Sequence, residues 1–99
     1  MTVREIAHAR AGDKGNTCNV SLIAFDRRNY PRLAERATAE RVAALFAGVV
    51  QGAVTRYELP HLGALNFVIT GALGGGVTRS LALDAHGKSL SSLLLSLEI

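Results

Sequence analysis

An amphipathic segment from Thr38 to Gly52 constrains the fold of this chain more than any other feature. Its apolar residues recur at i, i+3, i+4, i+7 and i+8, which places them on one stripe of a helix. This stripe consists of Val42, Leu45, Phe46, Val49 and Val50. Thr38 is a typical helix N-cap and Gly52 is a typical stop. The pattern therefore predicts a helix that buries one face.

Alternation of apolar and polar residues predicts four strands around this helix. The first is a short extended run through Val3 to His8, and the second spans Thr17 to Phe25. The third and fourth span Ala53 to Leu59 and Ala64 to Thr70. The four residues from Pro60 to Gly63 have the length of a hairpin turn, so we expect them to join the last two strands.

Two further helical segments complete the order of elements. Asn29 and Pro31 are suited to starting a short helical turn, which we expect to end near Ala37. A final helical stripe comprises Leu90, Leu93, Leu94 and Leu97. The order strand, strand, helix, strand, strand, helix becomes βαββαβ when the first strand is placed after the last helix. We therefore predict a two-layer α+β sandwich of ferredoxin-like, circularly permuted type, with two helices on one face of a mainly antiparallel sheet of four or five strands.

Length and composition fit one globular domain over residues 1–99, since 48% of the residues are hydrophobic and 19% are charged. No signal-peptide run follows the amino terminus, and the longest apolar run, Val42 to Val50, is too short to cross a membrane. Cys18 is the single cysteine and we expect it to be a buried apolar residue. These features predict a cytoplasmic protein that does not insert into a membrane.

Charge and histidine spacing argue against two other classes of protein. The net charge is +3, but the basic residues are scattered among acids, whereas a nucleic-acid surface needs clustered basic residues with aromatic residues between them. His8, His61 and His86 lack the short spacing of metal ligands. We therefore predict no nucleic-acid binding, no metal site and no cofactor.

The stretch "AGDKGN" at residues 11–16 is richer in polar residues and glycine than a hairpin turn requires. Its glycines can turn backbone amides toward an anion, Lys14 adds a positive charge, and Asp13 or His8 could transfer a proton if burial moved its pKa toward neutrality. The alternative is a plain hairpin in which Asp13 bonds nearby amides and the glycines supply positive φ. The stretch alone leaves both interpretations open.

A possible ligand site follows from the expected arrangement of the strands. We expect Thr17 to Phe25 and Ala64 to Thr70 to be the two middle strands and to run parallel, so that their beginnings share one edge of the sheet. That edge would bring residues 11–16 beside the Pro60 to Gly63 turn. The ligand-binding residues predicted to converge there are Asp13, Lys14, Asn16 and His61, and Asn19 is predicted as a further ligand-binding residue.

A second candidate loop, "GALGGGVTRS" at residues 71–80, is predicted at the opposite edge of the sheet. Its candidate residues are Gly74, Gly75, Gly76 and Arg79, because glycines leading into a helix can expose amides to an anion. The loop matches neither the dinucleotide-binding nor the P-loop pattern, and a flexible connection explains the glycines as well.

Three separated blocks of the sequence resemble one known family. They are "HARAGDKGNTCN" at 8–19, "RYELPHLGALNFVITGALGGGVTRSL" at 56–81 and "LDAHGK" at 83–88. In this order and spacing they are similar to the carboxy-terminal ferredoxin-fold domain of acyclic terpene utilisation (AtuA-type) proteins, and the resemblance covers nearly the whole chain. Asn16 and His61 depart from the residues expected there, which are Asp and Asn. No catalytic residue can be transferred from the family, so the catalytic residues stay unknown.

The resemblance implies a role in the breakdown of acyclic terpenes or branched acids, whose intermediates are coenzyme A thioesters. It also implies a larger AtuA-type protein as partner. We therefore expect an accessory or interaction domain that is not catalytic alone. The alternatives are a small ligand-binding protein or enzyme acting on an acyl-CoA or carboxylate, and a structural self-associating module. One face of the sheet carries no helices, so we expect it to be covered by a second copy or a partner, and we expect a homo-oligomer when the chain is expressed alone.

Overall fold

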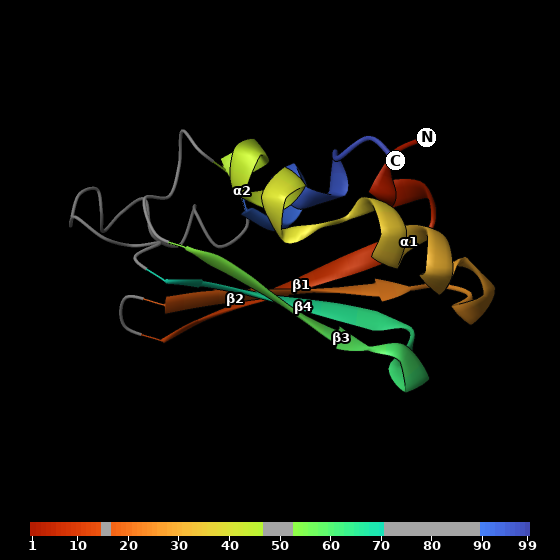
Figure 1. The fold of residues 1–99 in the computed structure, drawn as a ribbon, viewed down its shortest axis with the longest axis horizontal. Helices are drawn as coiled ribbons and strands as arrows, with labels where there is room; N and C mark the ends of the chain where they lie inside the picture. Colours follow the sequence, from red (N-terminus) through yellow and green to blue (C-terminus); the bar gives the residue numbers. More distant parts are fainter. Residues whose placement is uncertain (15–16, 47–52, 71–89) are drawn as a thin grey trace.

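The computed structural model describes residues 1–14, 17–46, 53–70 and 90–99, with Asp13 and Lys14 described by their backbone (Figure 1). Its strands are β1 (Ala7–Lys14), β2 (Thr17–Ala24), β3 (Val54–Leu59) and β4 (Ala64–Thr70). Its α-helices are α1 (Tyr30–Arg36) and α2 (Ala39–Phe46), and residues 90–95 are also helical. Short 3-10 turns are η1 (Val3–Glu5), η2 (Arg27–Asn29) and η3 (Pro60–Leu62).

The four strands form one antiparallel sheet in the order β1-β2-β4-β3. The helices of the described segments all lie on the same side of this sheet, so the molecule has two layers (Figure 1). With β1 moved behind the last helix, the strand order becomes that of a ferredoxin-like sandwich. The predicted α+β ferredoxin-like class is therefore confirmed.

The direction of the middle strands differs from the expected one. β2 and β4 are antiparallel, because Thr17 pairs with Thr70 and Ile23 pairs with Ala64. The segment containing α1 and α2 carries the chain back along the sheet, so that β3 runs in the same direction as β2. η3 then reverses the chain into β4, which lies between β2 and β3 and must run opposite to both. The prediction of parallel middle strands was therefore wrong.

The first strand begins and ends later than the apolar pattern indicated. Val3–Glu5 form a 3-10 turn, and the strand extends from Ala7 to Lys14. Gly12 pairs with Asn19 and Lys14 pairs with Thr17, so most of the stretch expected to be a loop belongs to the sheet. Alanine and glycine are weak strand formers, and the pairing with β2 overrides their local preference.

Capping explains where the helices begin. The Oγ1 of Thr38 accepts a hydrogen bond from the Arg41 backbone N–H at 3.1 Å, which confirms the predicted N-cap. Asn29 precedes α1, but its side chain makes no cap hydrogen bond. Asp26 instead caps the preceding turn η2 by accepting from the Arg28 N–H at 2.9 Å. The predicted stop at Gly52 lies outside the described residues.

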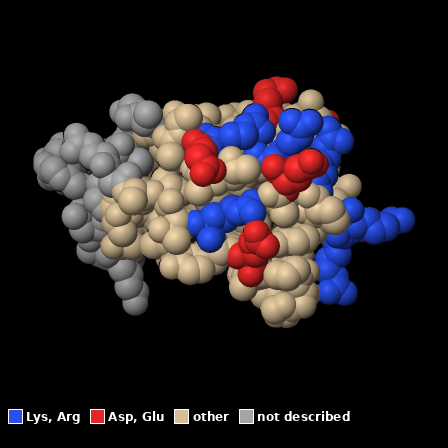
Figure 2. All heavy atoms as spheres, viewed as in Figure 1, with Lys and Arg blue, Asp and Glu red and all other residues tan. Residues whose placement is uncertain are grey.

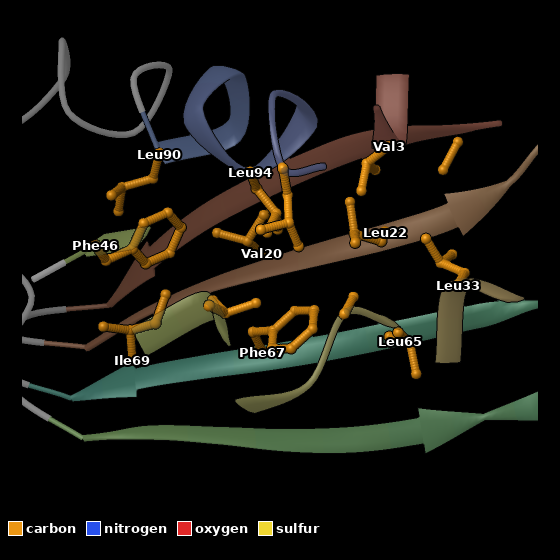
Figure 3. Packing of buried hydrophobic residues seen from close by; sticks show 14 of the residues in the cluster. Val3, Val20, Leu22, Leu33, Phe46, Leu65, Phe67, Ile69, Leu90 and Leu94 are labelled. Carbon is orange, nitrogen blue, oxygen red and sulfur yellow. The ribbon is translucent and has the colours of Figure 1, made fainter. Parts of the chain in front are cut away.

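The core lies between the helices and one face of the sheet (Figure 3). Phe46 of α2 and Leu90 and Leu94 of the last helix point toward side chains of β2 and β4. Those strand residues are Val20, Leu22, Leu65, Phe67 and Ile69, all completely buried. Among the described residues of the two predicted helical stripes, Val42, Phe46, Leu90, Leu94 and Leu97 are buried, and Leu45 and Leu93 are partly exposed. Val49 and Val50 of the first stripe lie outside the described residues. Cys18 is fully buried on β2, as its position in the alternating pattern indicated.

Candidate functional site

Two segments that were expected to meet, the end of β1 and the η3 turn, lie at opposite ends of the sheet (Figure 1). Lys14 is at the end where Thr17 pairs with Thr70. The η3 turn is at the other end, where Ala64 pairs with Ile23. Strands rise about 3.3 Å per residue, so the eight residues of β2 separate these ends by roughly 23 Å. The predicted convergence of Asp13 and Lys14 with His61 was therefore wrong, because it depended on parallel middle strands.

The remaining predicted site residues are dispersed. Asn19 is exposed on β2, and its side chain approaches Gly12 of β1, where an added Cβ would lie 3.8 Å from its Nδ2. His61 is exposed in η3, and its backbone oxygen accepts a hydrogen bond from Arg27 Nη1 at 2.7 Å. Asn16, the Gly74 to Gly76 segment and Arg79 lie outside the described residues.

The structure brings together a set of side chains that the sequence analysis did not single out. The face of the sheet turned away from the helices is called the open face here, and no described element lies over it (Figure 1). Its central row consists of Arg10 on β1, Ser21 on β2, Asn66 on β4 and Tyr57 on β3, which are successive partners in the strand register. We call this set the polar row.

An internal hydrogen bond organises the polar row. Ser21 Oγ donates to Asn66 Oδ1 at 2.9 Å, and both side chains are half-buried. Tyr57 and Arg10 stand at the two ends and are exposed, Tyr57 by 52%. The alternation in each strand could have shown that each of these residues shares a face with its neighbours at i+2. Their alignment depends on the register between strands, which no single stretch of sequence encodes.

Exposed aromatic groups flank one end of the open face. The rings of His8 and Phe25 are stacked, with centroids 5.5 Å apart and planes inclined by 17°. Phe25 is 65% exposed although it follows directly on β2. A polar row bordered by exposed aromatic residues is suited to contact with another protein surface, where aromatic and arginine side chains are enriched.

Comparison with known families agrees with this architecture. The model of the family described as the AtuA ferredoxin-like domain matches residues 1–99. The chain belongs to this family. No curated protein and no solved structure matches the chain significantly.

Several arginines of this AtuA ferredoxin-like domain bind backbone carbonyl groups. Arg56 Nη1 donates to the oxygens of Ala34 at 2.5 Å and Ala37 at 3.1 Å, and its Nη2 contacts Glu58 Oε2 at 2.6 Å. Arg41 donates to the oxygens of Arg36 and Glu98. These contacts join α1 to β3 and α2 to the last residues of the chain. They assign structural roles to residues that the sequence analysis treated only as scattered charge.

Two further arginines bind backbone oxygens of segments that are distant in the sequence. Arg27 and Arg32 donate to the backbone oxygens of His61 and Ile99, which are 34 and 67 residues away. In the view of Figure 1, acidic side chains lie among the basic ones on the described surface (Figure 2).

Shifted pKa values occur near the start of α1, away from the polar row. Hydrogen bonds from the Arg28 side chain and then from its backbone N–H lower the pKa of Asp26 to about 2. Burial raises the pKa of Tyr30, whose hydroxyl oxygen is buried without a hydrogen-bond partner in the described part of the chain. The pair of Asp26 and Arg28 stabilises the local turn η2.

Across the described segments, no group of three or more His, Cys, Asp or Glu side chains is arranged to hold a metal ion. None of the helices in those segments has the length and apolar character that a bilayer crossing requires.

Proposed function

We propose that this protein is an accessory domain that works with a larger AtuA-type protein in the breakdown of acyclic terpenes or branched acyl-CoA compounds. The observation that carries the proposal is the match of residues 1–99 to the AtuA ferredoxin-like domain family. The domain contributes binding surface, and the larger protein supplies the catalytic groups. The proposal places both in the cytoplasm.

The position of Asp13 and Lys14 supports a part in a shared ligand site. They are the last residues of β1, at the end of the sheet where Thr17 and Thr70 pair. A lysine at this rim presents a compact positive charge suited to a phosphate or carboxylate. In the proposed complex this rim forms one wall of the site, and the larger protein forms the others.

Co-expression with a separately encoded larger AtuA-type protein tests the interaction. The two chains should elute together from a size-exclusion column, and calorimetry should show that the complex binds an acyl-CoA more tightly than either chain alone. Lys14→Ala should preserve the complex and its thermal stability but weaken acyl-CoA binding about tenfold, because it removes one charged contact. Lys14→Arg should retain most of the binding, and Arg36→Ala, on the exposed side of α1, is the matched control.

Two results would overturn this proposal. One is failure of the chains to associate at micromolar concentration. The other is turnover of an acyl-CoA by the isolated domain at the rate of the co-expressed pair, which would make the domain itself the enzyme.

A further inference from the structure

We propose that the open face of the sheet pairs with the open face of a second copy of this chain, through a two-fold axis that runs along the strands. This inference goes beyond the accessory function, because it concerns the isolated domain and requires no other protein. It rests on the chemistry of the face and on the register of the strands.

Twelve positions form the central part of the open face, three from each strand. They are His8, Arg10 and Gly12; Asn19, Ser21 and Ile23; Ala64, Asn66 and Val68; and Thr55, Tyr57 and Leu59. Four exposed or half-buried positions in this set carry aliphatic or aromatic side chains, namely Ile23, Val68, Tyr57 and Leu59. Arg10 contributes the full charge, and no acidic residue is present. Two such faces repel each other unless each Arg10 lies against an aromatic ring or a hydrogen-bond acceptor of the other copy. The orientation of the second copy therefore decides whether the faces can pair.

A two-fold axis along the strands reverses the strand order of the second copy. β1 then lies over β3 of the second copy, and β2 lies over its β4. The polar row of one copy faces the polar row of the other in the opposite sense. A two-fold axis across the strands would instead lay β1 over β1, bringing both Arg10 side chains to the same edge, and is therefore disfavoured.

The centre of the reversed arrangement satisfies the polar groups of Ser21 and Asn66. Ser21 Oγ already donates to Asn66 Oδ1 within one chain, which leaves the two N–H groups of the Asn66 amide and an oxygen lone pair of Ser21. In the pair, Asn66 lies opposite Ser21 of the second copy and donates to its hydroxyl oxygen. Two internal and two intermolecular hydrogen bonds then form a closed ring. Packed sheets are about 10 Å apart, a spacing that these two short side chains can bridge.

The flanking positions are complementary in the same arrangement. Arg10 lies over the ring of Tyr57 of the second copy, where a guanidinium is attracted to the aromatic face. Ile23 lies over the small side chain of Ala64, and Thr55 lies over Gly12. At these two pairs a larger residue faces a small one, whereas His8 lies over Leu59 and Asn19 lies over Val68 of the second copy.

The dimensions of the sheet indicate an interface of modest affinity. Four strands about 4.8 Å apart and about seven residues long cover an area of roughly 20 by 23 Å. That area is below the usual size of a tight protein interface, so we expect a micromolar dissociation constant.

A charge exchange across the proposed axis tests the pairing. Sedimentation equilibrium of the isolated chain should show dimers of the 10.5 kDa chain at about 100 µM and dissociation on dilution. Tyr57→Arg places the new arginine over Arg10 of the second copy at both ends of the interface, and it should weaken dimerisation at least about tenfold. The double variant Arg10→Glu/Tyr57→Arg places Glu opposite Arg twice and should restore dimerisation to within about threefold of the parent chain. Arg36→Glu, at an exposed position of α1, is the matched control.

The substituted residues Arg10, Arg36 and Tyr57 are all exposed, so circular dichroism should show that each variant retains the parent fold. A parent chain that stays monomeric throughout this concentration range would overturn the proposal. A dimer that is unaffected by Tyr57→Arg, or that the double variant fails to restore, would also overturn it. These outcomes do not involve the larger AtuA-type protein and are therefore separate from the test of the accessory function.

Discussion

Arginine side chains in this protein connect elements that are distant in sequence. Arg27, Arg32 and Arg41 each donate to a backbone oxygen at least 34 residues away. A guanidinium carries five N–H donors in a planar fork, so one side chain can reach two acceptors, as Arg56 does with Ala34 and Ala37. These four arginines therefore hold together segments that are distant in the sequence.

Asp26 provides a test of this local chemistry. Its folded pKa of about 2 lies below its ordinary value of 3.8, so folding favours the ionised form. The stabilising contribution is thus fully present above pH 3.8 and is lost as the pH falls through about 2. Titration of the Asp26 carboxyl carbon by NMR should give this low midpoint. Arg28→Ala should raise it, since the side-chain hydrogen bonds are the main cause.

The control for this titration is Arg36→Ala, which should leave the midpoint unchanged. A midpoint near 3.8 in the parent protein would show that the pair with Arg28 does not persist in solution.

The helices and strands differ in how far the local sequence determines their secondary structure. Helix α2 follows from its periodic stripe and from the Thr38 cap, both of which are local features. Strand β1 consists largely of alanine, glycine and charged residues, and it is a strand because β2 supplies its hydrogen-bond partners. Local patterns therefore predicted α2 well and predicted only part of β1.

Substitution of Phe46 measures the contribution of α2 to the core. This side chain is completely buried against the sheet, whereas the neighbouring Leu45 is only partly buried. Phe46→Ala should lower the free energy of unfolding by about 3–5 kcal/mol, because it leaves a cavity as well as removing apolar contact. Leu45→Ala should cost less. Urea unfolding gives both values, and equal stability of the parent and Phe46→Ala would contradict the placement of α2.

At the scale of the whole molecule, the first and last residues lie together (Figure 1). The Ile99 N–H donates to the Met1 oxygen at 2.8 Å, and the Val3 N–H donates to the Leu97 oxygen at 2.9 Å. Thr2 and Glu98 also form an antiparallel bridge. β1 is the edge strand beside β2, and the two ends of the chain are adjacent. The same packing is therefore compatible with two chain connections, of which this protein has the one that places β1 before β2. The alternative places β1 after the last helix.

A circular permutant tests this relation. We expect a chain in which a short linker joins Ile99 to Met1, and which opens at residues 15–16 between β1 and β2, to form the same sheet. Its free energy of unfolding should stay within about 2 kcal/mol of the parent, since loop closure changes little. An amide NMR spectrum with dispersion like that of the parent would establish the fold.

The matched control opens the chain between Ser21 and Leu22, in the middle of β2, and should fail to fold. If both permutants unfold, or if both fold equally well, the position of β1 does not follow from the packing described here.

The sequence by itself determined the number and type of most elements, the buried stripe of α2 and the ferredoxin-like order, because periodicity and capping are properties of consecutive residues. Only the tertiary structure decided that β2 and β4 run antiparallel, and so that Lys14 and His61 lie at opposite ends of the sheet. It also decided that Arg10, Ser21, Asn66 and Tyr57 form one row. The physical reason is that strand direction and register arise from pairing between distant segments. A change of register by one residue would turn these side chains to the other face while leaving every local pattern intact.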